Sequence, residues 1–189
     1  MHRPYIHQLP TLTVDQADEP VRNTLEDVRR KLGFVPAMYA NMANLPGVLS
    51  TYLHGYGRFR AESGLTPVEQ EVVFLAISLA NECSYCTAAH SMVADKISGV
   101  PPAVLQALRD RTVVPDARLA ALHAFTTELL LTRGRPSAAQ VAAFYTAGYT
   151  EQHVLSLILA IAVKTLSNYS NHAFAPALDP AFAAYALPG

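Results

Sequence analysis

The sequence predicts a protein built from α-helices alone. Apolar residues recur at helical spacing along the 189 residues, and no stretch alternates apolar and polar residues between hairpin turns. Proline and glycine residues divide the chain into segments of helical length. Because 51% of the residues are hydrophobic and 15% are charged, we expect one buried core and a single domain over residues 1–189.

Three helices are predicted in the first third of the chain. The first covers Glu19–Leu32, since Pro20 stands at its start and Gly33 follows its end. Two further helices are expected over Ala37–Ala43 and Pro46–Glu62.

Two helices with the chemically most active residues come next. Thr66, Pro67 and Glu69 form a typical helix start, with a capping hydroxyl, a proline at the first position and a carboxylate three residues after the cap. We expect this helix to end near Asn81, and a second helix to cover Cys83–Ile97.

The rest of the chain predicts four more helices and a proline-rich tail. The helices are expected over Ala103–Arg109, Ala117–Thr132, Ser137–Ala147 and Glu151–Asn168. The cysteine segment has a faint copy near the end, in which His172 aligns with His90 and Asn168 with Cys86. This similarity suggests an internal duplication whose second copy keeps the histidine and lacks both thiols.

Charge and hydropathy exclude several classes of partner. The formal net charge is -1, and no run of basic residues is longer than residues 29–31, so we expect neither nucleic acid nor an anionic membrane as partner. The start of the chain lacks an apolar signal core, and the apolar run at 154–163 is too short to span a bilayer. We therefore expect a soluble, cytoplasmic protein. The shortage of charged residues favours a homo-oligomer with a buried interface.

Both cysteines of the chain lie in one short segment, Glu82–His90. If this segment is helical, Cys83 and Cys86 stand about one turn apart, and His90 follows Cys86 at i+4 on one face. Two thiols this close can form a disulfide with little chain movement, and an imidazole can accept a thiol proton to give the reactive thiolate. The spacing indicates redox or nucleophilic chemistry.

Four residues form a pattern with fixed gaps: Glu71, Cys83, Cys86 and His90. This pattern resembles the active-site motif of the alkylhydroperoxidase AhpD-like, peroxidase-related branch of the carboxymuconolactone decarboxylase family. The resemblance covers about residues 20–175, which leaves an N-terminal arm and the tail outside the core. It includes the segments Val35–Tyr39, Leu65–Pro67 and Asn168–His172.

The resemblance implies a helical bundle that assembles into trimers or hexamers and reduces hydroperoxides with thiols. It assigns Cys86 as the thiol that attacks the peroxide and Cys83 as the resolving thiol, while His90 and Glu71 form a proton relay. A separate dithiol or protein reductant must reset the pair, and no cofactor or metal is implied. Glu71 has to come from a neighbouring helix, since it would lie about 120° from Cys83 on a continuous one.

One position departs from the family pattern. Tyr85 stands between the cysteines, where peroxidases of this type can carry a second histidine. Its hydroxyl can instead donate a hydrogen bond to a thiolate or a bound peroxide, so Tyr85 and His172 are candidate pocket residues. Family members that act as decarboxylases lack the cysteine pair, and lactone decarboxylation is therefore disfavoured.

Other interpretations of the thiols remain open at this point. The same fold can serve a disulfide reductase or a thiol redox sensor, and the two cysteines can also be inert and buried. A zinc site with Cys83, Cys86 and His90 as ligands is a further alternative, although no second cysteine pair follows downstream. Several other residues are expected to be packing or surface residues: His54, His123, His153, Tyr52, Tyr56 and Phe59. For the three aromatic residues, the alternative is that they line the peroxide pocket.

Overall fold

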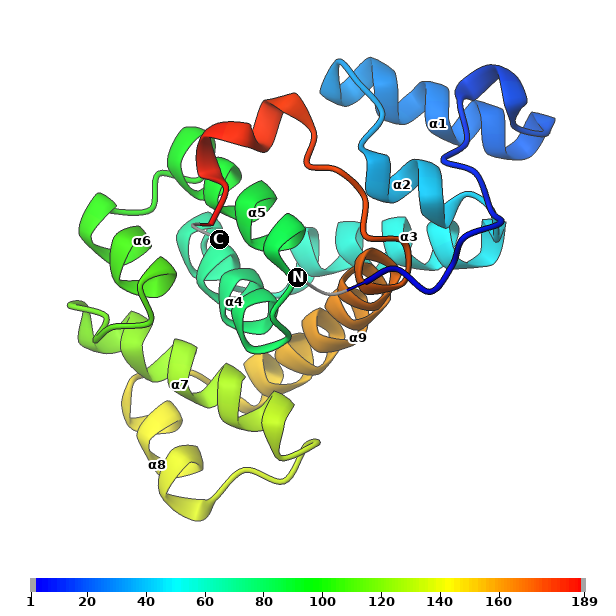
Figure 1. Cartoon of the computed structure of the whole chain (residues 1–189). Helices are drawn as coiled ribbons and strands as arrows, with labels where there is room; N and C mark the ends of the chain where they lie inside the picture. The colour runs from blue at the N-terminus through cyan, green and yellow to red at the C-terminus, as the bar shows by residue number, and fades with distance from the viewer. Residues whose placement is uncertain (1–2, 188–189) are drawn as a thin grey trace.

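The computed structural model describes residues 3–187, and in these residues it contains helices and no strand (Figure 1). The α-helices are α1 (Glu19–Leu32), α2 (Ala37–Met42), α3 (Pro46–Glu62), α4 (Pro67–Ala80), α5 (Ser84–Lys96), α6 (Pro102–Arg109), α7 (Ala117–Leu131), α8 (Ala138–Thr146) and α9 (Glu151–Phe174). Two 3₁₀ helices flank them, η1 (Val14–Gln16) and η2 (Pro180–Tyr185). The all-α prediction is confirmed.

The predicted helices are all present, and two of their boundaries differ in a way that matters. Cys83 caps α5 and is not part of it, because its backbone is extended, with φ -89° and ψ 93°. α9 runs on past the predicted end at Asn168 as far as Phe174. Its last turns carry polar side chains into the interior, a feature that apolar periodicity cannot predict.

Helix α4 lies in the middle of the molecule and packs against α5, α7 and α9. Its start is fixed as predicted, since the Thr66 hydroxyl accepts a hydrogen bond from Glu69 N (3.3 Å) and the Glu69 carboxylate accepts one from Thr66 N (2.8 Å). Every residue from Val72 to Leu79 is buried. A helix that is apolar on all sides belongs inside the protein, so α4 serves as the common wall of its neighbours.

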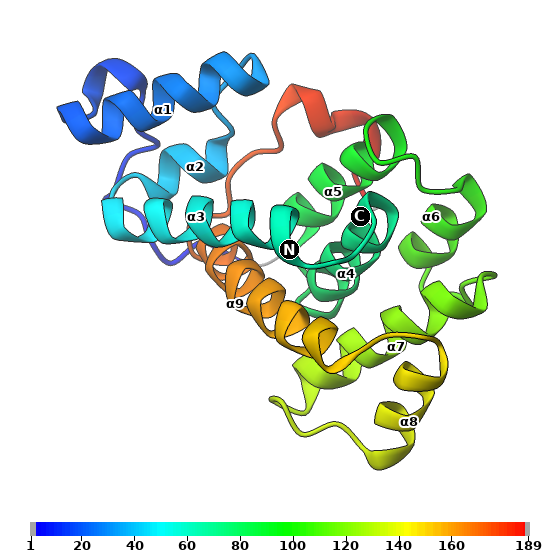
Figure 2. The ribbon, with the colours of Figure 1, turned by 180° about the vertical axis from the view of Figure 1, so that it is seen from behind.

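Helix α9 crosses α3 and packs against it (Figure 2). A glycine makes the close crossing possible: a Cβ atom on Gly55 would stand only 2.8 Å from Val163 Cγ2. The absence of a side chain at position 55 therefore allows the two helices to approach each other.

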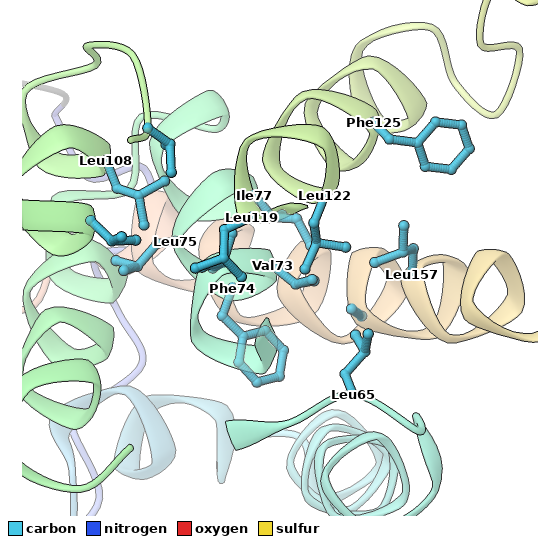
Figure 3. Close-up of a cluster of buried hydrophobic side chains, with 14 of the residues drawn as sticks. Leu65, Val73, Phe74, Leu75, Ile77, Leu108, Leu119, Leu122, Phe125 and Leu157 are labelled. Carbon is cyan, nitrogen blue, oxygen red and sulfur yellow. The ribbon is translucent and has the colours of Figure 1, made fainter. Parts of the chain in front are cut away.

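The buried side chains form two clusters, which we call the apolar core and the pocket core. The apolar core joins α4 to α6, α7, α8 and the first half of α9, and Figure 3 shows part of it. Its centre contains Phe74, Leu122, Phe125 and Leu157, all almost fully buried. The pocket core joins α1, α2, α3 and η2 to the thiol end of α5 and the second half of α9.

The segment after α9, which we call the C-terminal strap (residues 176–187), returns across the pocket core. In Figure 1 it passes from the end of α9 over α5, and η2 packs against α5. It is fastened at three places: the Asp179 carboxylate accepts a hydrogen bond from Ala37 N (3.2 Å), the Arg109 guanidinium donates one to Tyr185 O (3.0 Å), and Phe182 is buried.

No helix within residues 3–187 is both long and apolar enough to cross a membrane. The single domain, the internal duplication and the homo-oligomer stay predictions.

Candidate functional site

A sharp turn between α4 and α5 places the two thiols. Asn81 caps the end of α4, and Glu82 adopts the left-handed conformation, with φ 55°. The chain then reverses, so that Cys83 N donates a hydrogen bond to Ser78 O (2.9 Å). The break predicted near Asn81 is therefore confirmed, and it lets α5 return alongside α4.

Cys86 lies in the first turn of α5. The first intrahelical backbone bond in this turn runs from Thr87 N to Cys83 O (2.9 Å), so the amide groups of residues 84–86 precede it. The positive end of a helix favours an anion in this turn. Both thiols are free, and both side chains are about 2% exposed.

An amide from α9 contacts both sulfur atoms. Asn171 Nδ2 lies 3.2 Å from Cys86 Sγ and 3.8 Å from Cys83 Sγ, and 3.2 Å from Met38 Sδ. As a donor, this amide favours a negative charge on sulfur over a neutral thiol.

A buried carboxylate supports the histidine. Glu71 comes from α4, as the sequence predicts, and its Oε2 lies 2.9 Å from His90 Nδ1. Its Oε1 accepts a hydrogen bond from Arg60 of α3, and the same guanidinium also donates to the Tyr56 hydroxyl (2.7 Å). Glu71 is fully buried, so this pairing with two neighbours is what makes its charge tolerable.

The network orients His90 as a base. Burial alone would raise the pKa of Glu71, but His90 and Arg60 together hold that pKa below its ordinary value. Burial and the Lys164 charge lower the pKa of His90, although Glu71 opposes them. His90 is therefore a neutral imidazole near neutral pH, able to accept a proton.

Lys164 of α9 is the unexpected member of the site. It lies in the buried part of α9, and its Nζ has no hydrogen-bond partner within residues 3–187. The ammonium stands 5.7 Å from the centroid of the Phe74 ring, against which the His90 ring also packs.

The two thiols are inequivalent. Burial would raise the pKa of Cys86, but a hydrogen bond from Cys83 and the charge of Lys164 bring it well below its ordinary value. The pKa of Cys83 is raised, first because its proton is shared with Cys86 and then because of burial. These opposite directions favour ionisation of Cys86 over ionisation of Cys83.

A cavity of about 340 Å³ reaches this thiol. Cys86, His90 and Lys164 line it, whereas Cys83 does not. Most of the wall is apolar or aromatic, and the aromatic rings are those of Phe34, Tyr39, Tyr52, Tyr56, Tyr85 and Phe182. The charged side chains of the wall, within the described part of the chain, are both lysines: Lys31 and Lys164.

The two candidate pocket residues have different outcomes. Tyr85 lines the cavity, but its hydroxyl donates a hydrogen bond to Asp179 of the strap and accepts one from Met38 N (3.5 Å). These two hydrogen bonds join the strap to α2, so they are structural. His172 does not belong to the cavity wall; its ring stacks on that of Tyr169, with 6.3 Å between centroids.

Three residues at the centre of the site were not predicted: Arg60, Lys164 and Asn171. Lys164 did carry a signal, since a single lysine follows the long apolar run of α9. Asn171 belongs to the Asn168–His172 segment, in which the alignment with the cysteine segment indicates its neighbour His172 instead.

The aromatic residues of α3 divide between the two expected roles, packing and lining the pocket. Tyr52 and Tyr56 line the cavity, while Phe59 lies in the apolar core as expected. His153 accepts a hydrogen bond from Thr150 N (3.0 Å) at the start of α9, and burial lowers the pKa of His123. Both histidines lie outside the thiol cavity.

Metal ligands do not gather at this site. Across the part of the chain that the structure describes, no group of three or more histidine, cysteine, aspartate or glutamate side chains is placed to hold a metal ion. The zinc alternative with Cys83, Cys86 and His90 therefore gains no support.

Comparison with known proteins agrees with the motif. Residues 46–127, which include Glu71, both cysteines and His90, match the model of the carboxymuconolactone decarboxylase family. This match confirms the family resemblance that the sequence pattern predicts. No curated protein is significantly similar to the chain.

Two solved structures share the fold over almost their whole length. One is an alkylhydroperoxidase AhpD core, an uncharacterised peroxidase-related protein from Ralstonia eutropha JMP134; identity is 22%, 93% of each chain is covered, and the TM-score is 0.80. The other is an uncharacterised peroxidase-related protein from Silicibacter sp. TM1040, with 21% identity, coverage of 95% of this chain and 94% of that one, and a TM-score of 0.79. The AhpD-like fold is confirmed.

A third solved structure has the same fold and a different chemistry. It is a cysteine-to-alanine variant of the debrominase Bmp8 in complex with 2,3,4-tribromopyrrole, with 18% identity, 88% of each chain covered and a TM-score of 0.71. At this identity the likeness concerns the fold alone, and the fold therefore does not fix the substrate.

Proposed function

We propose that this protein is a thiol-dependent peroxidase that reduces hydroperoxides through Cys86 and Cys83. One observation carries the proposal: the thiol with the lowered pKa is also the thiol that lines the cavity. Since the thiolate is the nucleophilic form of cysteine, a molecule that enters the cavity meets the reactive sulfur first.

The first step is attack of the Cys86 thiolate on the terminal oxygen of a hydroperoxide. An S–O bond forms, the O–O bond breaks, and the bonding electron pair leaves with the alkoxide, which takes up a proton to become an alcohol. Cys86 is oxidised to a sulfenic acid and the peroxide is reduced. In this proposal His90, whose Nδ1 lies 2.9 Å from Glu71 Oε2, accepts a thiol proton before attack and returns it to the alkoxide.

The second step joins the two sulfur atoms. The Cys83 thiol gives up its proton and displaces the sulfenic oxygen as water, leaving a Cys83–Cys86 disulfide. The amide nitrogen of Asn171 contacts both sulfur atoms, so both lie close to the same group. A dithiol, small or protein-borne, then returns the pair to the reduced state by two thiol–disulfide exchanges.

The test is a thiol count by intact mass before and after one equivalent of cumene hydroperoxide. We expect a loss of two thiols and two hydrogen atoms, reversed by dithiothreitol. Cys86→Ser abolishes peroxide consumption, whereas Cys83→Ser gives one slow turnover and a sulfenic acid that dimedone traps. Full turnover by both variants would contradict the dithiol mechanism.

A second candidate function uses the same two electrons on a different bond. It is favoured by the aromatic wall of the cavity and by the debrominase of the same fold, solved with 2,3,4-tribromopyrrole. In that reaction the Cys86 thiolate takes bromine from an electron-rich ring, the ring carbon takes a proton, and Cys83 then displaces bromide to give the disulfide. Bromide release from 2,3,4-tribromopyrrole, with no response to cumene hydroperoxide, would favour it over peroxide reduction.

The disulfide reductase or redox sensor remains the alternative in which peroxide turnover is incidental. It requires a partner disulfide to reach Cys86 through the cavity. Reduction of a small linear disulfide such as cystamine, faster than reduction of cumene hydroperoxide at equal concentration, would support that alternative.

A further inference from the structure

The side chain of Lys164 presents an electrostatic problem that the proposed reaction does not explain. Lys164 is 0% exposed, and its ammonium nitrogen has no hydrogen-bond acceptor among residues 3–187. An ammonium ion in a protein interior is strongly unfavourable unless an anion compensates it. The face of the Phe74 ring, 5.7 Å away, offers only part of that compensation.

Few groups near Lys164 can supply the negative charge that its ammonium needs. The Glu71 carboxylate is committed, since one oxygen accepts from Arg60 and the other lies 2.9 Å from His90. No carboxylate belongs to the cavity wall formed by the described residues. The remaining group that can carry a negative charge on this wall is the sulfur of Cys86, since burial raises the pKa of the wall tyrosines.

We propose that Lys164 is the counter-ion of the Cys86 thiolate in the reduced protein. The two side chains line the same cavity from facing helices, α9 and α5, which pack together. The pair satisfies two requirements at once, since the thiolate compensates a buried ammonium and the ammonium stabilises a buried thiolate. The inference rests on the reduced dithiol of the proposed function and is independent of which substrate that dithiol reduces.

The other groups around Cys86 are neutral, so none of them balances a negative charge on its sulfur. They are Cys83, His90, Ser167, Asn171, Tyr39, Tyr52 and Tyr85. Two further cations lie near the cavity: the guanidinium of Arg60 is already paired with Glu71, and Lys31 is an exposed residue of the cavity wall. Within residues 3–187, Lys164 is therefore the cation free to pair with the sulfur.

The pairing has a consequence for the oxidised protein. Formation of the Cys83–Cys86 disulfide removes the negative charge and leaves Lys164 without a counter-ion. An anion from solution can then take the place of the thiolate in the cavity. Lys164 thus acts as a positioning residue that favours the reduced thiolate and makes the disulfide easier to reduce.

The experiment measures the pH dependence of Cys86 alkylation, in a Cys83→Ser background so that a single thiol reacts. Iodoacetamide is the probe, and no peroxide is present, so a failure of peroxide turnover leaves the result interpretable. We expect Lys164→Met to move the midpoint of the alkylation profile upward by about one pH unit or more, equivalent to about a tenfold loss of thiolate at a fixed pH below it. Lys164→Arg keeps the charge, so its midpoint should stay close to that of the Cys83→Ser parent.

Lys96→Met is the matched control, because it removes an exposed ammonium from the same helix as Cys86 and its side chain is 66% exposed. Its profile should coincide with that of the Cys83→Ser parent. Circular dichroism checks the fold of each variant, and Lys164→Gln replaces Lys164→Met if the latter does not fold. An unchanged midpoint in a folded, charge-free variant at position 164 would overturn the pairing.

Discussion

The apolar core and the pocket core share several helices, yet they solve different problems. α3, α5 and α9 contribute to both clusters, whereas α4 contributes to the apolar core alone. The apolar core contains no thiol and is filled by leucine, valine and phenylalanine side chains, many of them fully buried. The pocket core contains both thiols and borders a cavity of about 340 Å³.

The difference shows where this protein accepts buried charge. Glu71, His90 and Lys164 are all buried at the boundary of the two cores, beside the cavity. The apolar core supplies a rigid wall, so that charged groups can be held in fixed positions on the other side of α4. We therefore expect stability to depend mainly on the apolar core and reactivity on the pocket core. Glu71 is expected to be important for both.

The largest effect is expected where both roles meet. Glu71→Gln removes the charge that Arg60 and His90 share, and breaking a buried ion pair costs about 3–5 kcal/mol of unfolding free energy. We also expect loss of peroxide turnover, since His90 loses the partner that orients it. Urea unfolding and a peroxide assay measure the two effects; a stable but inactive variant would show that Glu71 serves catalysis alone.

The stabilising contribution of the Glu71 carboxylate should depend on pH. Because the folded-state pKa of Glu71 is lowered, its stabilising contribution is present above the unfolded-state pKa of about 4.3 and is lost as pH falls through the folded value. The difference in unfolding free energy between the wild-type protein and Glu71→Gln should therefore shrink below about pH 4. A difference that is constant from neutral to acid pH would contradict the pairing.

Leu122→Ala tests the apolar core on its own. Leu122 is fully buried there, so the substitution should cost about 2–5 kcal/mol through lost burial and a new cavity. The pH profile of Cys86 alkylation should stay unchanged, measured without urea, where the variant is still folded. A shifted profile would show that the two cores are coupled.

Gly55→Ala tests the crossing of α3 and α9 in the pocket core. The added methyl would meet Val163 Cγ2 at 2.8 Å, and we expect overpacking to cost about 1–3 kcal/mol. Gly57→Ala on the same helix is the control, since nothing lies within 4 Å of its Cβ position. Equal thermal midpoints for the two variants would show that the close crossing is not constrained.

The smallest stability effect is expected for Lys164→Met. Methionine fills a similar volume without charge, and Cys86 can become a neutral thiol once its counter-ion is gone, so unfolding free energy should change by no more than about 1 kcal/mol. A strong destabilisation would mean that the ammonium has a structural partner in addition to the thiolate.

Most of the fold could be predicted from the sequence because the signals that begin and end its helices are local. Thr66 with Glu69, Pro20 with Gly33, and Asn81 mark helix ends through interactions within a few residues. The boundary of α9 was missed because its last turns are held by tertiary contacts, such as that of Asn171 with the thiols. Local propensity has no information on such contacts.

The same distinction explains the site. Cys83, Cys86, His90 and Glu71 were found because they form a spaced pattern in one stretch of chain. Arg60, Lys164 and Asn171 reach the site from α3 and α9, so only the packing of those helices against α4 and α5 reveals them. Their residue types alone did not distinguish them from surface residues.

Position 182 is suited to a fluorescent probe of the C-terminal strap. Its ring meets those of Phe34 and Tyr85 edge-on, with centroids 5.8 Å and 5.9 Å away, at the wall of the cavity. The sequence contains nine tyrosines and no tryptophan, so Phe182→Trp would place the sole indole of the molecule in this wall. Its fluorescence, excited selectively over tyrosine, would shift to longer wavelength when water replaces the aromatic neighbours. The emission spectrum would thus follow the strap in real time as a ligand enters.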